Sequence, residues 1–239
     1  MADQRLIVAL DVQTEAEAQK LVQDLGDAVN FYKVGMELYY AVGREIVSWL
    51  KQENKRVFVD LKLHDIPNTV AGAVRSLIHL GADFIDVHAS GGSKMMKRAA
   101  EAAREEAERL HVERPKLLAV TILTSISEAE WDMLGWNVQL EAQALHFAHL
   151  AQEAGMDGVI ASPMEAQTIR EACGKDFLIV TPGVRPAGAA INDQSRITTP
   201  AIALESGASY LVIGRPIREA MRPRHAAEKI LQEMQEAHV

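Results

Sequence analysis

The chain turns from apolar to charged within residues 57–69, which read Val57-Phe58-Val59-Asp60-Leu61-Lys62-Leu63-His64-Asp65-Ile66-Pro67-Asn68-Thr69. The first three residues are apolar and mostly β-branched, as in a buried strand. Because side chains alternate along a strand, Asp60 and Lys62 point to the same face. Burying a charge is costly unless it finds a partner, so a chain that only had to fold would place apolar residues here. We therefore expect a functional charged pair at a strand end, the alternative being a purely structural ion pair.

Similar apolar runs alternate with amphipathic segments along the whole chain. Predicted strands cover residues 6–11, 31–36, 56–62, 84–89, 116–123, 158–162, 177–183 and 210–215. Predicted helices cover roughly residues 15–25, 38–53, 68–80, 93–110, 138–154, 164–173, 199–206 and 223–236. Eight strand–helix units in 239 residues predict an α/β fold, a (β/α)8 TIM barrel that forms a single domain over residues 1–239. The alternative is a doubly wound open sheet, but residues 11–14 lack the glycines of a dinucleotide-binding turn.

Helix boundaries carry their own signals. Three segments open on a helix-start pattern: Thr14-x-x-Glu17, Ser162-Pro163-x-Glu165 and Thr199-Pro200. Glycines follow three of the helical patterns: Gly81, Gly155 and Gly207. Each of these glycines is followed within a few residues by the next strand, as in the short αβ loops of a barrel.

Composition narrows the function. The formal net charge of −8 lacks the basic excess of a general nucleic-acid binder, although an anionic substrate stays compatible with locally gathered positive charge. Cys173 is the only cysteine, so no internal disulfide can form, and a reducing compartment is expected. The N-terminus lacks a signal-peptide pattern, and no apolar run reaches the roughly 18 residues of a membrane helix. We expect a cytoplasmic protein that binds no membrane.

The polar residues gather at one end of the predicted strands. In this fold the active site lies at the carboxyl ends of the strands. Those ends carry Asp11, Lys33, Asp60, Lys62, Asp86, His88, Thr121 and Thr124, whereas the opposite ends are almost all apolar. Asp86 and His88 fit either a direct role or a supporting one, and His64 fits a structural turn equally well. Strands 7 and 8 end in Thr181-Pro182-Gly183 and Gly214-Arg215, and this one-sided distribution predicts an active site at the carboxyl ends of the strands.

A phosphate site is expected beside the last two strands, where this fold commonly forms one. Gly214 lets the backbone approach an anion, and Arg215 supplies a guanidinium fork for phosphate oxygens. The long loop after the seventh strand adds Arg185 and Gln194 and could close as a lid. The alternative cradle, Gly91-Gly92-Ser93, has no arginine and reads as a tight turn that starts a helix.

Together these residues resemble a known family. The similarity to orotidine 5′-phosphate decarboxylases of the bacterial type extends from Asp11 to Arg215. It is carried by Asp60-x-Lys62-x-x-Asp65, Pro67-Asn68-Thr69, Lys33, Val120-Thr121-x-x-Thr124-Ser125, Thr181-Pro182-Gly183 and Ile213-Gly214-Arg215. The Asp-x-Lys-x-x-Asp core is shared with a wider set of phosphosugar decarboxylases and aldolases, and the continuation from His64 to Thr69 is more specific.

The resemblance implies decarboxylation of orotidylate to uridylate, the last step of pyrimidine nucleotide synthesis, without metal or cofactor. It also implies a homodimer in which Asp65 completes the partner's charged array and Thr69 reaches the partner's ribose. The remaining implied roles are a charged array of Lys33, Asp60 and Lys62, ribose binding by Asp11 and Lys33, pyrimidine contact by Thr124, and phosphate binding by Arg185, Gln194, Gly214 and Arg215.

The chemistry of the residues agrees with this implication. Loss of carbon dioxide leaves negative charge on C6, and the Lys62 ammonium can stabilise that carbanion and then protonate it. Two other functions stay open. A related metal-dependent aldolase or decarboxylase would use Asp60 to hold magnesium, and a non-catalytic protein would only bind a phosphorylated metabolite.

Overall fold

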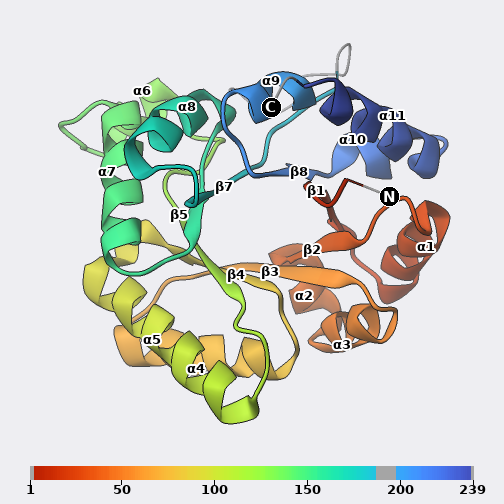
Figure 1. Cartoon of the computed structure of the whole chain (residues 1–239), viewed down its shortest axis with the longest axis horizontal. Coiled ribbons are helices and arrows are strands. Elements are labelled where there is room, and N and C mark those ends of the chain that lie inside the picture. Colours follow the sequence, from red (N-terminus) through yellow and green to blue (C-terminus); the bar gives the residue numbers. More distant parts are fainter. Residues whose placement is uncertain (1–2, 187–197, 238–239) are drawn as a thin grey trace.

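The computed structural model describes residues 3–186 and 198–237 (Figure 1). Within these ranges eight parallel strands form a closed barrel in chain order, and the last strand pairs with the first. The strands are β1 (Leu6–Ala9), β2 (Phe31–Gly35), β3 (Arg56–Leu63), β4 (Phe84–His88), β5 (Lys116–Val120), β6 (Gly158–Ile160), β7 (Leu178–Thr181) and β8 (Tyr210–Ile213). The predicted (β/α)8 barrel is therefore confirmed.

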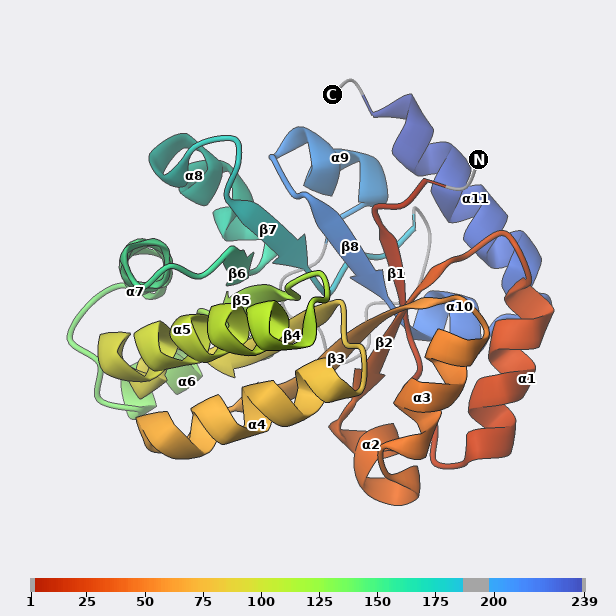
Figure 2. The ribbon, with the colours of Figure 1, turned by 60° about the horizontal axis from the view of Figure 1, so that its bottom comes forward.

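Helices surround the barrel and connect successive strands (Figures 1 and 2). They are α1 (Glu15–Leu25), α2 (Met36–Val42), α3 (Glu45–Gln52), α4 (Pro67–His79), the 3-10 turn η1 (Ala89–Gly91), α5 (Ser93–Leu110), α6 (Glu128–Met133), α7 (Leu140–Glu153), α8 (Pro163–Cys173), α9 (Pro200–Glu205), α10 (Arg215–Arg218) and α11 (Pro223–Glu236). The capping boxes predicted at Thr14 and Ser162 are both present, and Thr199 caps α9.

The predicted boundaries need three corrections. The single helix predicted over 38–53 is two helices, because Gly43 adopts a φ of +77° and ends α2. The short helices α6 and α10 were not predicted. Helix α6 nevertheless has a clear signal, since Ser127 and Glu130 form a capping box. Seven of the eight strands also end earlier than predicted, whereas β3 ends one residue later, and the polar residues beyond the strands lie in the loops that line the barrel mouth.

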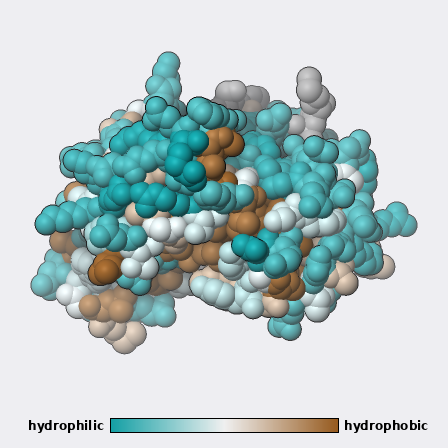
Figure 3. Space-filling model, turned by 90° about the horizontal axis from the view of Figure 1, so that it is seen from below, coloured by the Kyte–Doolittle hydropathy of each residue, from teal (hydrophilic) through white to brown (hydrophobic). Residues whose placement is uncertain are grey.

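The core has two layers. Inward-facing side chains fill the barrel, and a larger cluster packs between the barrel and its helices. The end of the barrel opposite the carboxyl ends of the strands is closed by Arg56, whose guanidinium lies 4.1 Å from the centre of the Phe31 ring. The face of the molecule shown in Figure 3 is mainly hydrophilic, with hydrophobic residues gathered in patches. The packed interior leaves the carboxyl ends of the strands as the open face of the barrel.

Candidate active site

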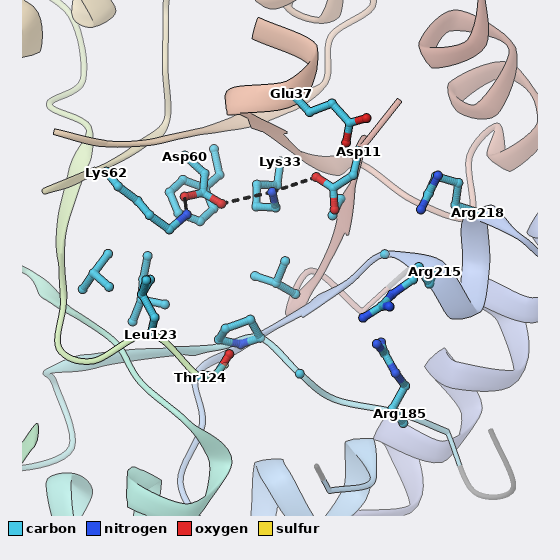
Figure 4. Close-up of a pocket in the computed structure, with 18 of the residues that line it drawn as sticks. Asp11, Lys33, Glu37, Asp60, Lys62, Leu123, Thr124, Arg185, Arg215 and Arg218 are labelled. Atoms are coloured by element: carbon cyan, nitrogen blue, oxygen red, sulfur yellow. Dashed lines mark hydrogen bonds and ion pairs between the residues drawn. The ribbon is translucent and has the colours of Figure 1, made fainter. Parts of the chain in front are cut away.

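A cavity of about 390 Å³ opens at the carboxyl ends of the strands (Figure 4). Its floor is apolar, because side chains from the barrel interior reach it, among them Ala9, Phe58, Val120, Ile160 and Val212. Its polar lining consists of Asp11, Lys33, Glu37, Asp60, Lys62, Thr124, Arg185, Arg215 and Arg218. Strands far apart in the sequence thus contribute charged groups to one enclosed space.

Four charged side chains form an alternating row along one side of the cavity (Figure 4). Lys33 Nζ lies 3.1 Å from Asp11 Oδ1 and 3.0 Å from Asp60 Oδ2. The other oxygen of Asp60, Oδ1, accepts a hydrogen bond from Lys62 Nζ. Each ammonium in the row therefore has at least one carboxylate partner, and Asp60 is shared by both lysines.

The row holds Asp60 and Lys33 in the charged state. Burial alone raises the pKa of Asp60, but the adjacent ammonium groups of Lys33 and Lys62 outweigh burial and hold that pKa well below its usual range. Burial lowers the pKa of Lys33, whereas the Asp60 and Asp11 carboxylates raise it by more, so that the net shift is upward. The pairing thus keeps a buried carboxylate and a buried ammonium ionised beside each other.

Two arginines mark the other end of the cavity. The side chains of Arg185 and Arg215 point toward one another (Figure 4). Both lie at the end of the cavity that is distant from Lys62. Arg215 follows Gly214 at the start of α10, and Arg185 follows the turn at Gly183, whose φ is +77°. The backbone N–H of Arg185 donates a hydrogen bond to the Thr198 carbonyl at 2.9 Å, which fixes the backbone beside the Arg185 side chain. This end of the cavity suits a dianion.

The structure thus brings together Asp11, Lys33, Asp60, Lys62, Thr124, Arg185, Gly214 and Arg215 from the sequence prediction. It does not bring Asp65 or Thr69 into the cavity of their own chain, since both are exposed and neither lines it. Asp65 Oδ1 instead accepts the N–H of Ile66 at 2.6 Å. Gln194 lies outside the described residues. The alternative cradle at Gly91-Gly92-Ser93 forms η1 and the start of α5, as expected for a turn, and does not line the cavity.

Asp86 and His88 lie beside the row and do not line the cavity. Asp86 is fully buried on β4, and its Oδ1 accepts the backbone N–H of Lys62 at 2.9 Å. His88 packs against His64 with ring centres 5.3 Å apart. Burial lowers the pKa of His88 to about 4, and the charges of His64 and Lys62 contribute. Both residues therefore support the segment that carries Lys62.

Three residues of the site were missed by the sequence analysis. Gly35 ends β2, and a Cβ atom there would lie 2.8 Å from Lys33 Nζ and 3.3 Å from Asp11 Oδ1. The sequence does place Gly35 beside the Lys33 side chain, because it comes two residues after Lys33 and therefore lies on the same face of the strand. Glu37 and Arg218 also line the cavity, and nothing in their sequence context distinguishes them from solvated helix residues.

The described residues contain neither a cluster of metal ligands nor a membrane-spanning helix. In residues 3–186 and 198–237, no group of three or more His, Cys, Asp or Glu side chains is arranged to hold a metal ion. Over the same residues, no helix combines the length and the apolar character needed to cross a membrane. Two carboxylates of the cavity, Asp11 and Asp60, both contact the Lys33 ammonium.

Known proteins resemble this chain over nearly its whole length. The model of the orotidine 5′-phosphate decarboxylase / HUMPS family matches residues 4–230. The orotidine 5′-phosphate decarboxylase of Moorella thermoacetica is 52% identical over 235 residues, which cover 98% of this chain and 93% of that protein. The enzyme of the same name from Syntrophomonas wolfei is 47% identical and covers 98% of this chain and 99% of its own. The crystal structure of orotidine 5′-phosphate decarboxylase from Lactobacillus acidophilus superposes with a TM-score of 0.86 at 42% identity, covering 97% of this chain and 99% of that one.

Proposed function

Since the chain belongs to the orotidine 5′-phosphate decarboxylase / HUMPS family and is a carboxy-lyase, we propose that its own cavity converts orotidine 5′-phosphate to uridine 5′-phosphate and carbon dioxide. The observation that carries the proposal is one cavity with the Asp11–Lys33–Asp60–Lys62 row on one side and Arg215 at its far end. A nucleotide offers a phosphate for the arginine end and a ribose and base for the row. The reaction belongs to pyrimidine nucleotide synthesis.

The proposed chemistry rests on Lys62. The bond between C6 and the carboxylate carbon breaks, carbon dioxide departs, and the electron pair stays on C6. The Lys62 ammonium stabilises this negative charge and then donates a proton to C6, and solvent restores the proton to Lys62. Lys62 suits this role because Asp60 fixes its Nζ at the cavity wall. The mechanism as proposed needs no metal or cofactor.

Asp60 and Lys33 keep that ammonium in place. Asp60 pairs with the Lys62 Nζ, while Lys33 keeps Asp60 ionised on its other side. Because these groups are fixed before the substrate arrives, they need no reorganisation while charge develops on C6. Lys33 and Asp11 also face the region where the ribose hydroxyls would lie once the phosphate sits at the arginine end.

The substrate is held at points remote from C6. We assign the phosphate to Arg185, Gly214 and Arg215, together with Gln194 from outside the described residues, and the pyrimidine to Thr124. An arginine fork matches phosphate oxygens in geometry and charge. Binding energy gained at this end can serve to orient C6 against Lys62.

We further propose that the enzyme is a cytoplasmic homodimer and that residues 1–239 act as one catalytic domain. Asp65 is exposed in its own chain and is followed by Ile66, whose exposed fraction of 68% is large for an isoleucine. An exposed apolar residue beside an outward carboxylate suits a contact between two copies. Two-fold symmetry would make the exchange of Asp65 and Thr69 reciprocal.

The activity is tested with purified protein by following the absorbance change of orotidylate in the presence of excess chelator. We expect turnover by the wild type and almost none by Lys62→Ala at an unchanged melting temperature. Loss of wild-type activity on chelation, restored by magnesium, would favour the metal-dependent alternative. Binding of the nucleotide without turnover would favour the non-catalytic alternative.

The shared site is tested by mixing Lys62→Ala with Asp65→Ala and letting the subunits exchange. A mixed dimer has one doubly damaged site and one intact site. Random mixing puts half of the molecules in mixed dimers, so about a quarter of all sites should recover. Confirmed exchange without recovery would mean that Asp65 serves its own chain.

A further inference from the structure

Asp86 is a buried acid for which the proposed mechanism has no use. It lies on β4 with none of its surface exposed. Its Oδ1 accepts the backbone N–H of Lys62, and among the described residues no group donates a hydrogen bond to its Oδ2. A buried carboxyl oxygen without a donor is costly if it carries charge, so its presence beside the proposed proton donor needs an explanation.

The backbone of Lys62 has an unusual conformation. Its φ is +49°, in the left-handed region that L residues seldom adopt. The other non-glycine residues with positive φ in the described ranges are Asn54 and His111, and both follow the end of a helix, where this conformation is common. Lys62 instead adopts it inside a strand, which requires support from the surrounding structure.

The strand pairing shows where that support comes from. Val59 pairs with Ile85 and Leu63 with Val87, so residues 60–62 of β3 face Asp86 alone on β4. This bulge removes Lys62 from the regular ladder of backbone hydrogen bonds. The Asp86 side chain replaces the missing backbone acceptor at 2.9 Å. An apolar residue at position 86 would leave the N–H of Lys62 without this bond.

The Asp86 carboxyl group has charged neighbours. Asp60 and Lys62, both on β3, are the charged groups that act on it, and the Asp60 carboxylate lies within hydrogen-bonding reach. Two buried carboxylates in contact cannot both be ionised at low cost, and Asp60 is the one held charged by two lysines. Burial and the Asp60 charge both raise the pKa of Asp86, which agrees with a proton on Asp86.

We infer that Asp86 is a positioning residue whose neutral carboxyl accepts the backbone N–H of Lys62 at Oδ1 and donates a hydrogen bond from Oδ2 to Asp60. One side chain thereby fixes both members of the Asp60–Lys62 pair. It acts on the backbone of one and on the carboxylate of the other, without touching the substrate. The catalytic consequence rests on the proposed function, and the structural part rests on the bond to the Lys62 N–H, the buried Oδ2 and the neighbouring Asp60 carboxylate.

The test compares Asp86→Asn with Asp86→Leu. Asparagine has the same shape and offers both an acceptor and a donor, so kcat should stay within about threefold of the wild type. Leucine removes both bonds, and kcat should fall by about 100-fold, the effect of misplacing a reacting group by about 1 Å, while KM changes little. A folded Asp86→Leu enzyme with normal kcat would overturn the inference. An equal loss of kcat in Asp86→Asn and Asp86→Leu would contradict the inference that the Asp86 carboxyl is neutral.

A second measurement covers the case in which Asp86→Leu does not fold. Carbon-13 labelling of the aspartate carboxyl carbons in the wild type should give one signal of a protonated carboxyl at pH 7, and that signal should be missing in Asp86→Asn. An ionised Asp86 at pH 7 overturns the inference. Absence of wild-type turnover would instead be a failure of the proposed function, and the labelling result would be unaffected by it.

Discussion

Replacing Gly35 by alanine tests whether the position of Lys33 matters for catalysis. The added Cβ would lie 2.8 Å from Lys33 Nζ, and ordinary contacts begin near 3.4 Å, so the ammonium must move by about 0.6 Å. Such a move lengthens ion pairs that now measure 3.0 and 3.1 Å, to Asp60 and Asp11. At an effective dielectric constant of about 20, each pair is weakened by about 1 kcal/mol. If both losses are felt in the transition state, kcat/KM falls by about 30-fold.

The fold should tolerate this change. Gly35 has a φ of −89° and a ψ of 179°, which alanine adopts without strain, and the atom it approaches is the end of a flexible side chain. The control is Gly72→Ala, because Gly72 is exposed on α4 and a Cβ there meets nothing within 4 Å. That control should keep full activity and gain about 0.5–1 kcal/mol of stability. Orotidylate turnover and thermal melting of both variants are the measurements. Wild-type kcat/KM in Gly35→Ala would refute the argument that the row works only at its present spacing.

Three further predictions concern other parts of the molecule. Arg215→Ala should cost about 2–5 kcal/mol of transition-state stabilisation with orotidylate and far less with orotidine, which lacks the phosphate; equal losses with both substrates would give Arg215 a structural role. The pKa of His88 is lowered to about 4 by burial and by the charges of His64 and Lys62. The unfolded chain, with a histidine pKa of about 6.5, therefore takes up the proton first as pH falls, so stability should drop between about pH 6.5 and 4. His88→Asn should flatten that decline in melting temperature, and an unchanged pH profile would contradict the assignment. Ser127→Ala should weaken α6 by about 1 kcal/mol through loss of its cap, seen as faster amide exchange in that helix at unchanged kcat, and unaltered exchange would show that the cap contributes nothing.

The barrel could be predicted from the sequence because its signals are local. Apolar runs, capping boxes and glycines each act within a few residues, and Thr14 and Ser162 begin helices as predicted. The meeting of Lys33 with Asp60 could also be predicted, since both lie at the carboxyl ends of neighbouring strands. The split between α2 and α3 at Gly43 was missed because a helical pattern continues on both sides of that residue.

The parts of the site that could not be predicted depend on contacts between distant residues. Strand alternation already placed Asp60 and Lys62 on one face, but it gave no sign of the bulge that leaves Asp86 opposite them. The position of Gly35 two residues after Lys33 can be read from the sequence, but the close approach of a Cβ there to Lys33 Nζ and Asp11 Oδ1 follows only from the fold. Asp65 is exposed and lies outside the cavity of its own chain, and its proposed place in the site of a second copy is something that no pattern within one sequence describes.

The pairing of β1 with β8 has a consequence for how the protein is made. Leu6 pairs with Leu211 and Val8 with Ile213, so the seam of the barrel joins the first strand synthesised to the last. The charged row comes from residues 11–62, whereas the arginine end comes from residues 185–215. During synthesis, the segment that carries the charged row therefore leaves the ribosome early. The chain cannot bind a phosphorylated ligand until β8 and the arginine end of the cavity have also been released. Truncation before β8, which removes Gly214 and Arg215, should consequently abolish recognition of the nucleotide.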